Sequence, residues 1–172
     1  MFTNTLWYKK GLWNHKPLWI PAVSSSTPIT IGSSPTNRGS SFVPAYTLID
    51  LANPTTISGT LTLVTFWFNT NATNVKVATF YNTGTNKYTC RAVSSVIPSV
   101  ASASAIGVAI SLACQAGDVV GMFAEAGSIE RDASGGVQVD AKSGDFLTVG
   151  LETTFSSLNT NHAISVQLTG SG

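Results

Sequence analysis

The strongest constraint on the fold is an alternation of large apolar residues with small or polar ones at a period of two, interrupted at short intervals by turn-forming residues. In the clearest case, residues 106–113 (IGVAISLA), Ile, Val and Leu alternate with Gly, Ala and Ser. Residues 59–68 alternate first and end apolar on both faces, which indicates a strand with a second cover such as a subunit interface. No window carries an apolar stripe of helical period. The pattern therefore predicts an all-β chain.

Turn formers bound each of the further strands that we expect. These are 42–51, 75–81, 87–93, 119–124, 137–141, 146–151 and 163–168, with a short strand at 29–31 and a loop at 99–105. Such a series must hide its edges in packed sheets or by oligomerising. We therefore expect an antiparallel β-sandwich of the jelly-roll type, preceded by an extended N-terminal arm.

Three regions of different composition divide the chain. Residues 1–23 form an aromatic arm, residues 24–41 a Ser/Pro-rich bridge that favours extended or mobile chain, and residues 42–172 the β domain. Burial of one tryptophan stabilises by about 4–6 kcal/mol at roughly 25 cal/mol per Å². Ordering some twenty residues costs on the order of 20–40 kcal/mol in backbone entropy, so the arm must be buried as a whole, on this chain or on a neighbour. Since the bridge gives it reach, we favour a neighbour.

The arm residues predicted to contact a partner are aromatic anchors with two adjacent lysines. They are Trp7, Tyr8, Trp13 and Trp19, with Lys9 and Lys10. Interrupting charges exclude a signal peptide, and no apolar run is long enough to span a bilayer, so we expect no membrane insertion. The basic residues are too few for a nucleic-acid site.

Charge is unevenly distributed along the chain, although charged residues make up only 10% of it. Residues 1–91 carry seven basic side chains and one acidic one, whereas residues 92–172 carry two basic and seven acidic ones. Either oppositely charged surfaces of different subunits meet, or strands from both halves interleave within one domain. We favour interleaving, because early and late strands commonly pair in Greek-key folds.

No constellation of residues predicts catalysis. His15 and His162 lie in polar, turn-like contexts without a nucleophile motif, and Cys90 and Cys114 lack metal-ligand spacing and are expected as buried thiols rather than as one disulfide. The late acidic residues could hold calcium or hydrolyse a glycoside, but their order lacks the alternation of a calcium loop, so we favour a solvated hairpin tip. They are Glu125, Glu130, Asp132, Asp140 and Asp145. We expect no enzyme, cofactor or metal.

Three stretches carry a resemblance to known proteins: VKVATFY at 75–81, KYTCR at 87–91 and AGDVVGMF at 116–123. In these the chain resembles the small jelly-roll domains of bacteriophage virion appendages, of the capsid decoration and fibre type, and more distantly trimeric tumour-necrosis-factor-type and C1q-type heads. The resemblance implies a non-enzymatic structural protein of the virion, assembled in the host cytoplasm, that forms a homo-oligomer, with a trimer favoured, and binds other virion proteins. The alternative is a lectin-like module that binds a host receptor or glycan through Trp67, Tyr81 or Tyr88.

Overall fold

The structure is a computed structural model that describes residues 26–172, without the side chains of residues 158 and 159. The described chain is all-β, contains no helix, and its paired strands run antiparallel. It therefore also contains no helix that could cross a membrane. The strands are β1 (Pro28–Gly32), β2 (Ser41–Phe42), β3 (Tyr46–Asp50), β4 (Gly59–Trp67), β5 (Ala72–Gly84), β6 (Lys87–Val93), β7 (Ile97–Val100), β8 (Ala105–Cys114), β9 (Val119–Phe123), β10 (Ile129–Asp132), β11 (Gln138–Ser143), β12 (Glu152–Thr154), β13 (Ser156–Thr160), β14 (Ala163–Ile164) and β15 (Val166–Ser171).

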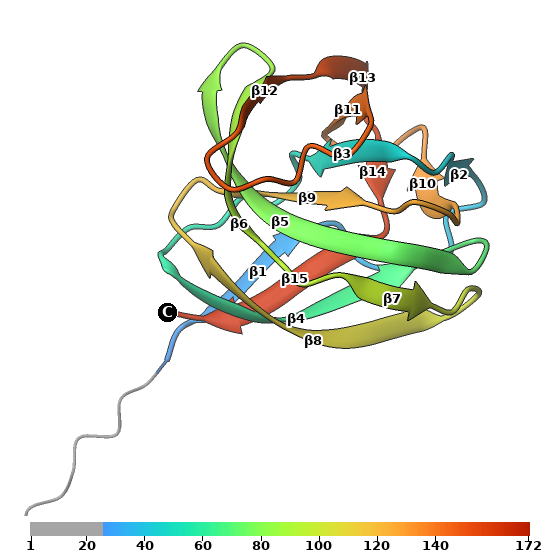
Figure 1. Cartoon of the computed structure of the whole chain (residues 1–172), viewed down its shortest axis with the longest axis horizontal. Coiled ribbons are helices and arrows are strands. Elements are labelled where there is room, and N and C mark those ends of the chain that lie inside the picture. Colours follow the sequence, from blue (N-terminus) through green and yellow to red (C-terminus); the bar gives the residue numbers. More distant parts are fainter. Residues whose placement is uncertain (1–25) are drawn as a thin grey trace, which may run out of the picture.

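One sheet has four strands in the order β1-β15-β4-β8 (Figure 1). Its registers align one inward row of Val108, Val64, Leu168 and Ile31 across all four strands. The last three of these side chains are fully buried, as the alternating pattern of the strands requires. The chain enters this sheet beside its own C-terminus, where Thr27 and Gly172 exchange two backbone hydrogen bonds of 2.9 and 3.0 Å.

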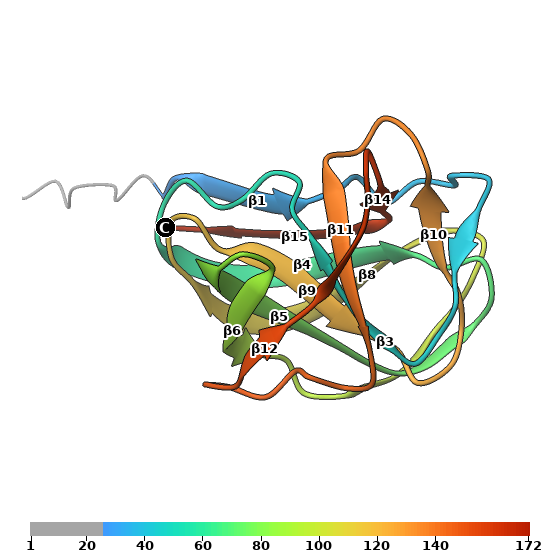
Figure 2. The same cartoon turned by 90° about the horizontal axis from the view of Figure 1, so that it is seen from above.

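The second sheet has eight strands and curls until it is nearly closed. Its order is β12-β6-β5-β9-β3-β11-β13, and β7 pairs with β5 beside this path. A small sheet, β14-β10-β2, covers one end (Figure 2). The antiparallel all-β prediction is confirmed, but the strands are distributed over sheets of four, eight and three rather than the two similar sheets expected of a jelly roll.

The main core lies between the four-stranded and the eight-stranded sheets. Phe66 and Phe68 of the β4 region form its centre, with ring centroids 5.5 Å apart and no exposed surface. Leu48, Val77 and Met122 cover them from the eight-stranded sheet.

A second core lies on the other face of the eight-stranded sheet. Phe155, in the segment that passes over this face, contacts Phe80 and Tyr88 edge-on at centroid distances of 6.2 and 6.0 Å. Leu147 and Cys90 complete the cluster. The eight-stranded sheet is therefore covered on both faces here, and the four-stranded sheet keeps one face open.

Several predicted boundaries are wrong. The strand expected at 42–51 is divided into β2 and β3, because Pro44 lacks an N–H and Ala45 has a φ of 62°. Residues 146–151 form turns rather than a strand, and Leu147 anchors them in the second core. β7 falls partly within the loop expected at 99–105, and β10 was not predicted as a strand.

The described part of the Ser/Pro-rich bridge is extended chain, and the short strand expected at 29–31 is present. Residues 28–32 form β1, paired with β15, and residues 33–41 lead directly into β2. Arg38 fixes this connection through its backbone N–H on Glu130 (2.9 Å) and its guanidinium on Asp132 (2.6 Å). The described part of the bridge therefore belongs to the β domain and gives the arm no additional reach.

Candidate interaction surface

The outer face of the four-stranded sheet is free of charge. Its strands β1, β4, β8 and β15 contain no Asp, Glu, Lys, Arg or His. We call the outward row residues the neutral face: Thr30, Leu63, Thr65, Gly107, Ala109 and Thr169, none of which is buried. Soluble domains usually carry charges on an open sheet face, so this surface differs from the rest of the molecule.

Leu63 is the largest exposed apolar residue at the centre of the neutral face. It lies between Thr169 of β15 and Ala109 of β8, and its side chain is 40% exposed. A methyl group on Gly107 would lie 3.4 Å from Leu63 Cδ1, so the leucine leans towards this glycine. The β8 side of the face carries only Gly, Ala and Ser outward, which leaves it flat and accessible to a large side chain.

The edge of the sheet at β8 is open. β8 pairs with β4 alone, and among the described residues no backbone hydrogen bond links it to another strand. Ile106, Val108 and Ile110 point towards the main core yet stay half-exposed, whereas their neighbours Val64 and Phe66 on β4 have no exposed surface. Strands β5 and β6 contact β8 on this side, and Thr79 Oγ1 donates to the carbonyl of Ala113 (2.9 Å), but this cover is incomplete over the three aliphatic side chains.

Charged residues gather instead on the other sheets and pair with each other. Four ion pairs join a cation from the first half of the chain to an acid from the second half. They are Arg38–Asp132, Lys76–Asp145, Lys87–Glu152 and Arg91–Asp118. The favoured expectation of interleaved halves is confirmed, because each cation of residues 26–91 is paired within its own chain. Lys9, Lys10 and Lys16 lie outside the described residues.

A partly buried polar network surrounds Arg38 between β3, β10 and β15. The guanidinium donates to Ser165 Oγ (2.8 Å), Asp132 Oδ2 (2.6 Å) and the carbonyl of Ser34 (2.8 Å). Nearby Asp50 is fully buried and accepts a hydrogen bond from Ala52 N–H at 2.9 Å. Burial raises the pKa of Asp50 to about 6, although this hydrogen bond and the charge of Arg38 act in the opposite direction.

The predicted acidic cluster is dispersed. Glu130 is buried in β10 rather than solvated at a hairpin tip, and Asp140 is buried on the second-core face. Asp145 pairs with Lys76, while Glu125 is exposed and accepts from the Asn74 amide. Across residues 26–172 no three His, Cys, Asp or Glu side chains are grouped so that they could hold a metal ion.

The three predicted glycan-stacking residues do not form one platform. Tyr88 is only 4% exposed and packs on Phe155, so its prediction as a stacking surface is wrong. Burial and the adjacent charge of Asp140 raise the pKa of Tyr88 to about 12. Tyr81 is half-buried with the Arg91 guanidinium 4.6 Å above its ring, and Trp67 is half-buried at one end of β4.

The other predicted residues divide into buried ones and undescribed ones. Trp7, Tyr8, Lys9, Lys10, Trp13 and Trp19, together with His15, lie outside the described residues. His162 is buried, and so are Cys90 and Cys114, which are free thiols. Burial raises the pKa of both thiols, that of Cys90 to about 11. The two thiols are therefore unreactive packing residues in the described chain.

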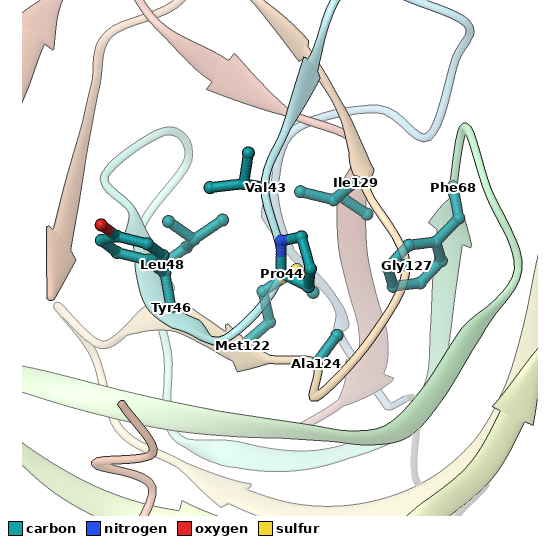
Figure 3. Close-up of a pocket in the computed structure, with 9 residues that line it drawn as sticks. All are labelled: Val43, Pro44, Tyr46, Leu48, Phe68, Met122, Ala124, Gly127 and Ile129. Carbon is teal, nitrogen blue, oxygen red and sulfur yellow. The ribbon is translucent and has the colours of Figure 1, made fainter. Parts of the chain in front are cut away.

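A small apolar hollow lies between β3, β9 and β10, and Figure 3 shows its lining, which includes Tyr46, Phe68 and Ile129. Its volume is about 10 Å³, which approaches the space of a single water molecule. It is far smaller than a pocket for an organic ligand, since such pockets measure roughly 300–1,000 Å³. The neutral face and the open β8 edge are therefore the surfaces on which a functional interpretation can be built.

Charge-free strands in the sequence correspond to this surface, but no chemical motif marks it. Residues 59–67 and 105–114 lack charge, but their outward Thr, Ala and Gly are common in any strand. Only the register of β4 with β8 shows that these residues lie side by side on one face. Comparison with known proteins adds no further constraint. No protein-family model, no curated protein and no solved structure matches this chain.

Proposed function

We propose that this protein is a non-enzymatic structural component of a bacteriophage particle, of the capsid decoration or fibre type. Its β domain self-associates through the neutral face, and its N-terminal arm anchors it to neighbouring subunits. A jelly-roll ancestry and a trimeric state belong to this proposal, as the resemblance of residues 75–81, 87–91 and 116–123 implies.

The single observation that carries the proposal is the neutral face. A solvated sheet face repels another copy less when it has no charge, and its desolvation costs less. Thr, Ala and Gly side chains permit close sheet-to-sheet contact, and Leu63 supplies an apolar centre. The ion pairs of the remaining surface are already satisfied within the chain, so electrostatic attraction is not required for assembly.

Light scattering on the full chain tests self-association. We expect an oligomer for the native chain and a monomer for Leu63→Lys, because a lysine at the centre of the face would be buried without a partner. Leu151→Lys is the matched control, since Leu151 has the same 40% exposure but lies far along the chain in a turn on the second-core side. A monomeric native chain, or equal behaviour of the two variants, would refute the proposed interface.

Particle attachment tests the virion role. Deleting residues 1–23 is expected to abolish attachment to the particle while the β domain stays folded, as judged by circular dichroism. Normal attachment of the truncated chain would contradict the anchoring role of the arm.

The second candidate is a glycan- or host-receptor-binding module. The half-buried rings of Trp67 and Tyr81 favour it, because an aromatic ring with one accessible face can stack on a sugar, although Arg91 covers one face of Tyr81. Binding on a glycan array that is lost in Trp67→Ala or Tyr81→Ala, with the oligomeric state unchanged, would support this function over assembly.

A further inference from the structure

The first half of the β8 edge, Ala105–Ala109, lacks the usual protection of a sheet edge. Strand β8 runs for ten residues without a charge or a proline. Its one irregularity lies opposite Thr62, where the register with β4 shifts, and it leaves Ala105–Ala109 regularly paired. Natural edge strands are blunted by charges, prolines, bulges or short length, because unpaired main-chain groups recruit other strands. The opposite edge, β1, has only five residues and begins with Pro28.

The side chains of β8 are arranged for an additional strand. On the inward side Ile106 and Val108 line a half-covered apolar gap that extends to the main core. On the outward side Ala105, Gly107 and Ala109 leave free space above the sheet. A strand added here would need aliphatic side chains towards the gap and would find room for a large aromatic one on the neutral face.

We propose that the stretch Leu18-Trp19-Ile20 in the N-terminal arm of a neighbouring copy adds to β8 as a further strand. In an extended strand Leu18 and Ile20 point to one side and Trp19 to the other. Leu18 and Ile20 fill the gap beside Ile106 and Val108, and Trp19 lies on the outward side over Gly107. The flanking Pro17 and Pro21 limit the added strand to this short stretch, since proline interrupts a ladder.

The position of the arm favours a neighbour as the donor. The described chain begins at the β1 edge, and β8 is the far edge of the same sheet, three strand spacings or roughly 14 Å away. Through the registers Pro28 is level with Ala113, so Ala105–Ala109 lie towards the opposite end of the sheet as well, and an arm of the same copy would have to cross the sheet diagonally to reach them. Each copy thus has a donor at one edge and an acceptor at the other. Such head-to-tail contacts form a ring when the rotation between copies closes, and the trimer of the proposed function, on which this inference rests, is a ring of this kind.

Hydrogen exchange of the full chain, measured by mass spectrometry at low and high protein concentration, tests the inference. In the assembled state we expect exchange of 105–109 to slow by at least about tenfold, and tryptic cleavage after Lys16 to slow in parallel. Val108→Lys should remove both effects, because a charge then projects into the gap. Val96→Lys, at a valine that is 51% exposed in the loop before β7, is the matched control and should behave as the native chain.

Trp19→Ser provides a second variant that leaves the β domain untouched, and it should expose 105–109 as Val108→Lys does. An oligomer whose β8 edge exchanges freely would overturn the inference and leave the proposed self-association intact. Equal protection in a dilute, monomeric chain would assign the edge to the chain's own arm and overturn the neighbour as donor. A chain that is monomeric at every concentration with an unprotected edge would refute both the inference and the proposed assembly.

Discussion

Substituting the buried carboxylate of Asp50 by an amide tests the polar network around Arg38. Asp50 is fully buried, and burial raises its pKa from 3.8 to about 6. In the unfolded chain Asp50 releases its proton near pH 4, whereas in the folded chain it holds the proton to about pH 6. A carboxyl whose folded-state pKa is raised therefore lowers the free energy of unfolding as the pH rises through this window.

The size of the effect follows from the shift. About two units at 1.36 kcal/mol each give roughly 3 kcal/mol of destabilisation by the native Asp50 above pH 7, and most of it develops between pH 4 and 7. Asp50→Asn cannot titrate. The difference in unfolding free energy between the variant and the native chain should therefore move in favour of the variant by about 2–3 kcal/mol from pH 4 to pH 7.

Urea denaturation at half-unit pH intervals, followed by circular dichroism, measures this difference. Glu152→Gln serves as a control with the opposite sign, since the Lys87 ammonium lowers the pKa of Glu152 and its contribution is lost as the pH falls. If the curves of native and Asp50→Asn chains stay parallel from pH 4 to 7, the assignment of a raised pKa to Asp50 is refuted.

Three further predictions concern other buried features. Arg91→Ala should destabilise the fold by about 3–5 kcal/mol in urea denaturation, because it leaves the Asp118 carboxylate, 1% exposed, without its ion-pair partner. Gly121→Ala should cost about 1–3 kcal/mol in thermal or urea unfolding, because its methyl group would collide with the Phe80 ring. The Cys90 thiol should not react with Ellman's reagent at pH 8 in the folded chain, since its pKa is raised to about 11.

Each of these predictions has a control in the same chain. Lys87→Ala removes an exposed ion pair and should cost less than about 1 kcal/mol. Gly107→Ala places its methyl group in ordinary contact with Leu63 and should be neutral or slightly stabilising. Cys114 should react with Ellman's reagent together with Cys90, and only on unfolding. Early reaction of one thiol per folded chain would contradict the buried positions of the two cysteines.

The strands with one buried face could be predicted from sequence, because apolar residues alternate with polar or small ones when one face of a strand is buried and the other is solvated. β4 and β8 follow their alternating patterns within a few residues, and the continuously apolar run of β9, which is buried on both faces, was also placed correctly. β10 was missed because its sequence, IERD, is charged, yet Glu130 is buried and bonded to the backbone of Arg38 from a distant segment. No local pattern contains that partner, so tertiary contacts decide the strand.

The second core could not be predicted for a related reason. Residues 146–151 are apolar enough to suggest a strand, but their role is to cover a sheet that already has a core on its other face. Similarly, the Ser/Pro-rich composition of the bridge predicts extended or mobile chain, but it does not indicate that Arg38 fixes residues 33–41 on the β domain. The sequence indicated which residues were polar and could not indicate which distant groups satisfy them.

The position of β15 determines when this protein can fold during its synthesis. Strand β15, Val166–Ser171, lies between β1 and β4, so the four-stranded sheet cannot form until residues 166–171 have left the ribosome. Among the described residues β1 pairs only with β15, so residues 28–32 have no strand partner before that point. A chain that stopped before residue 166 would keep β4 and β8 as a two-stranded ribbon and would leave part of the main core without its cover.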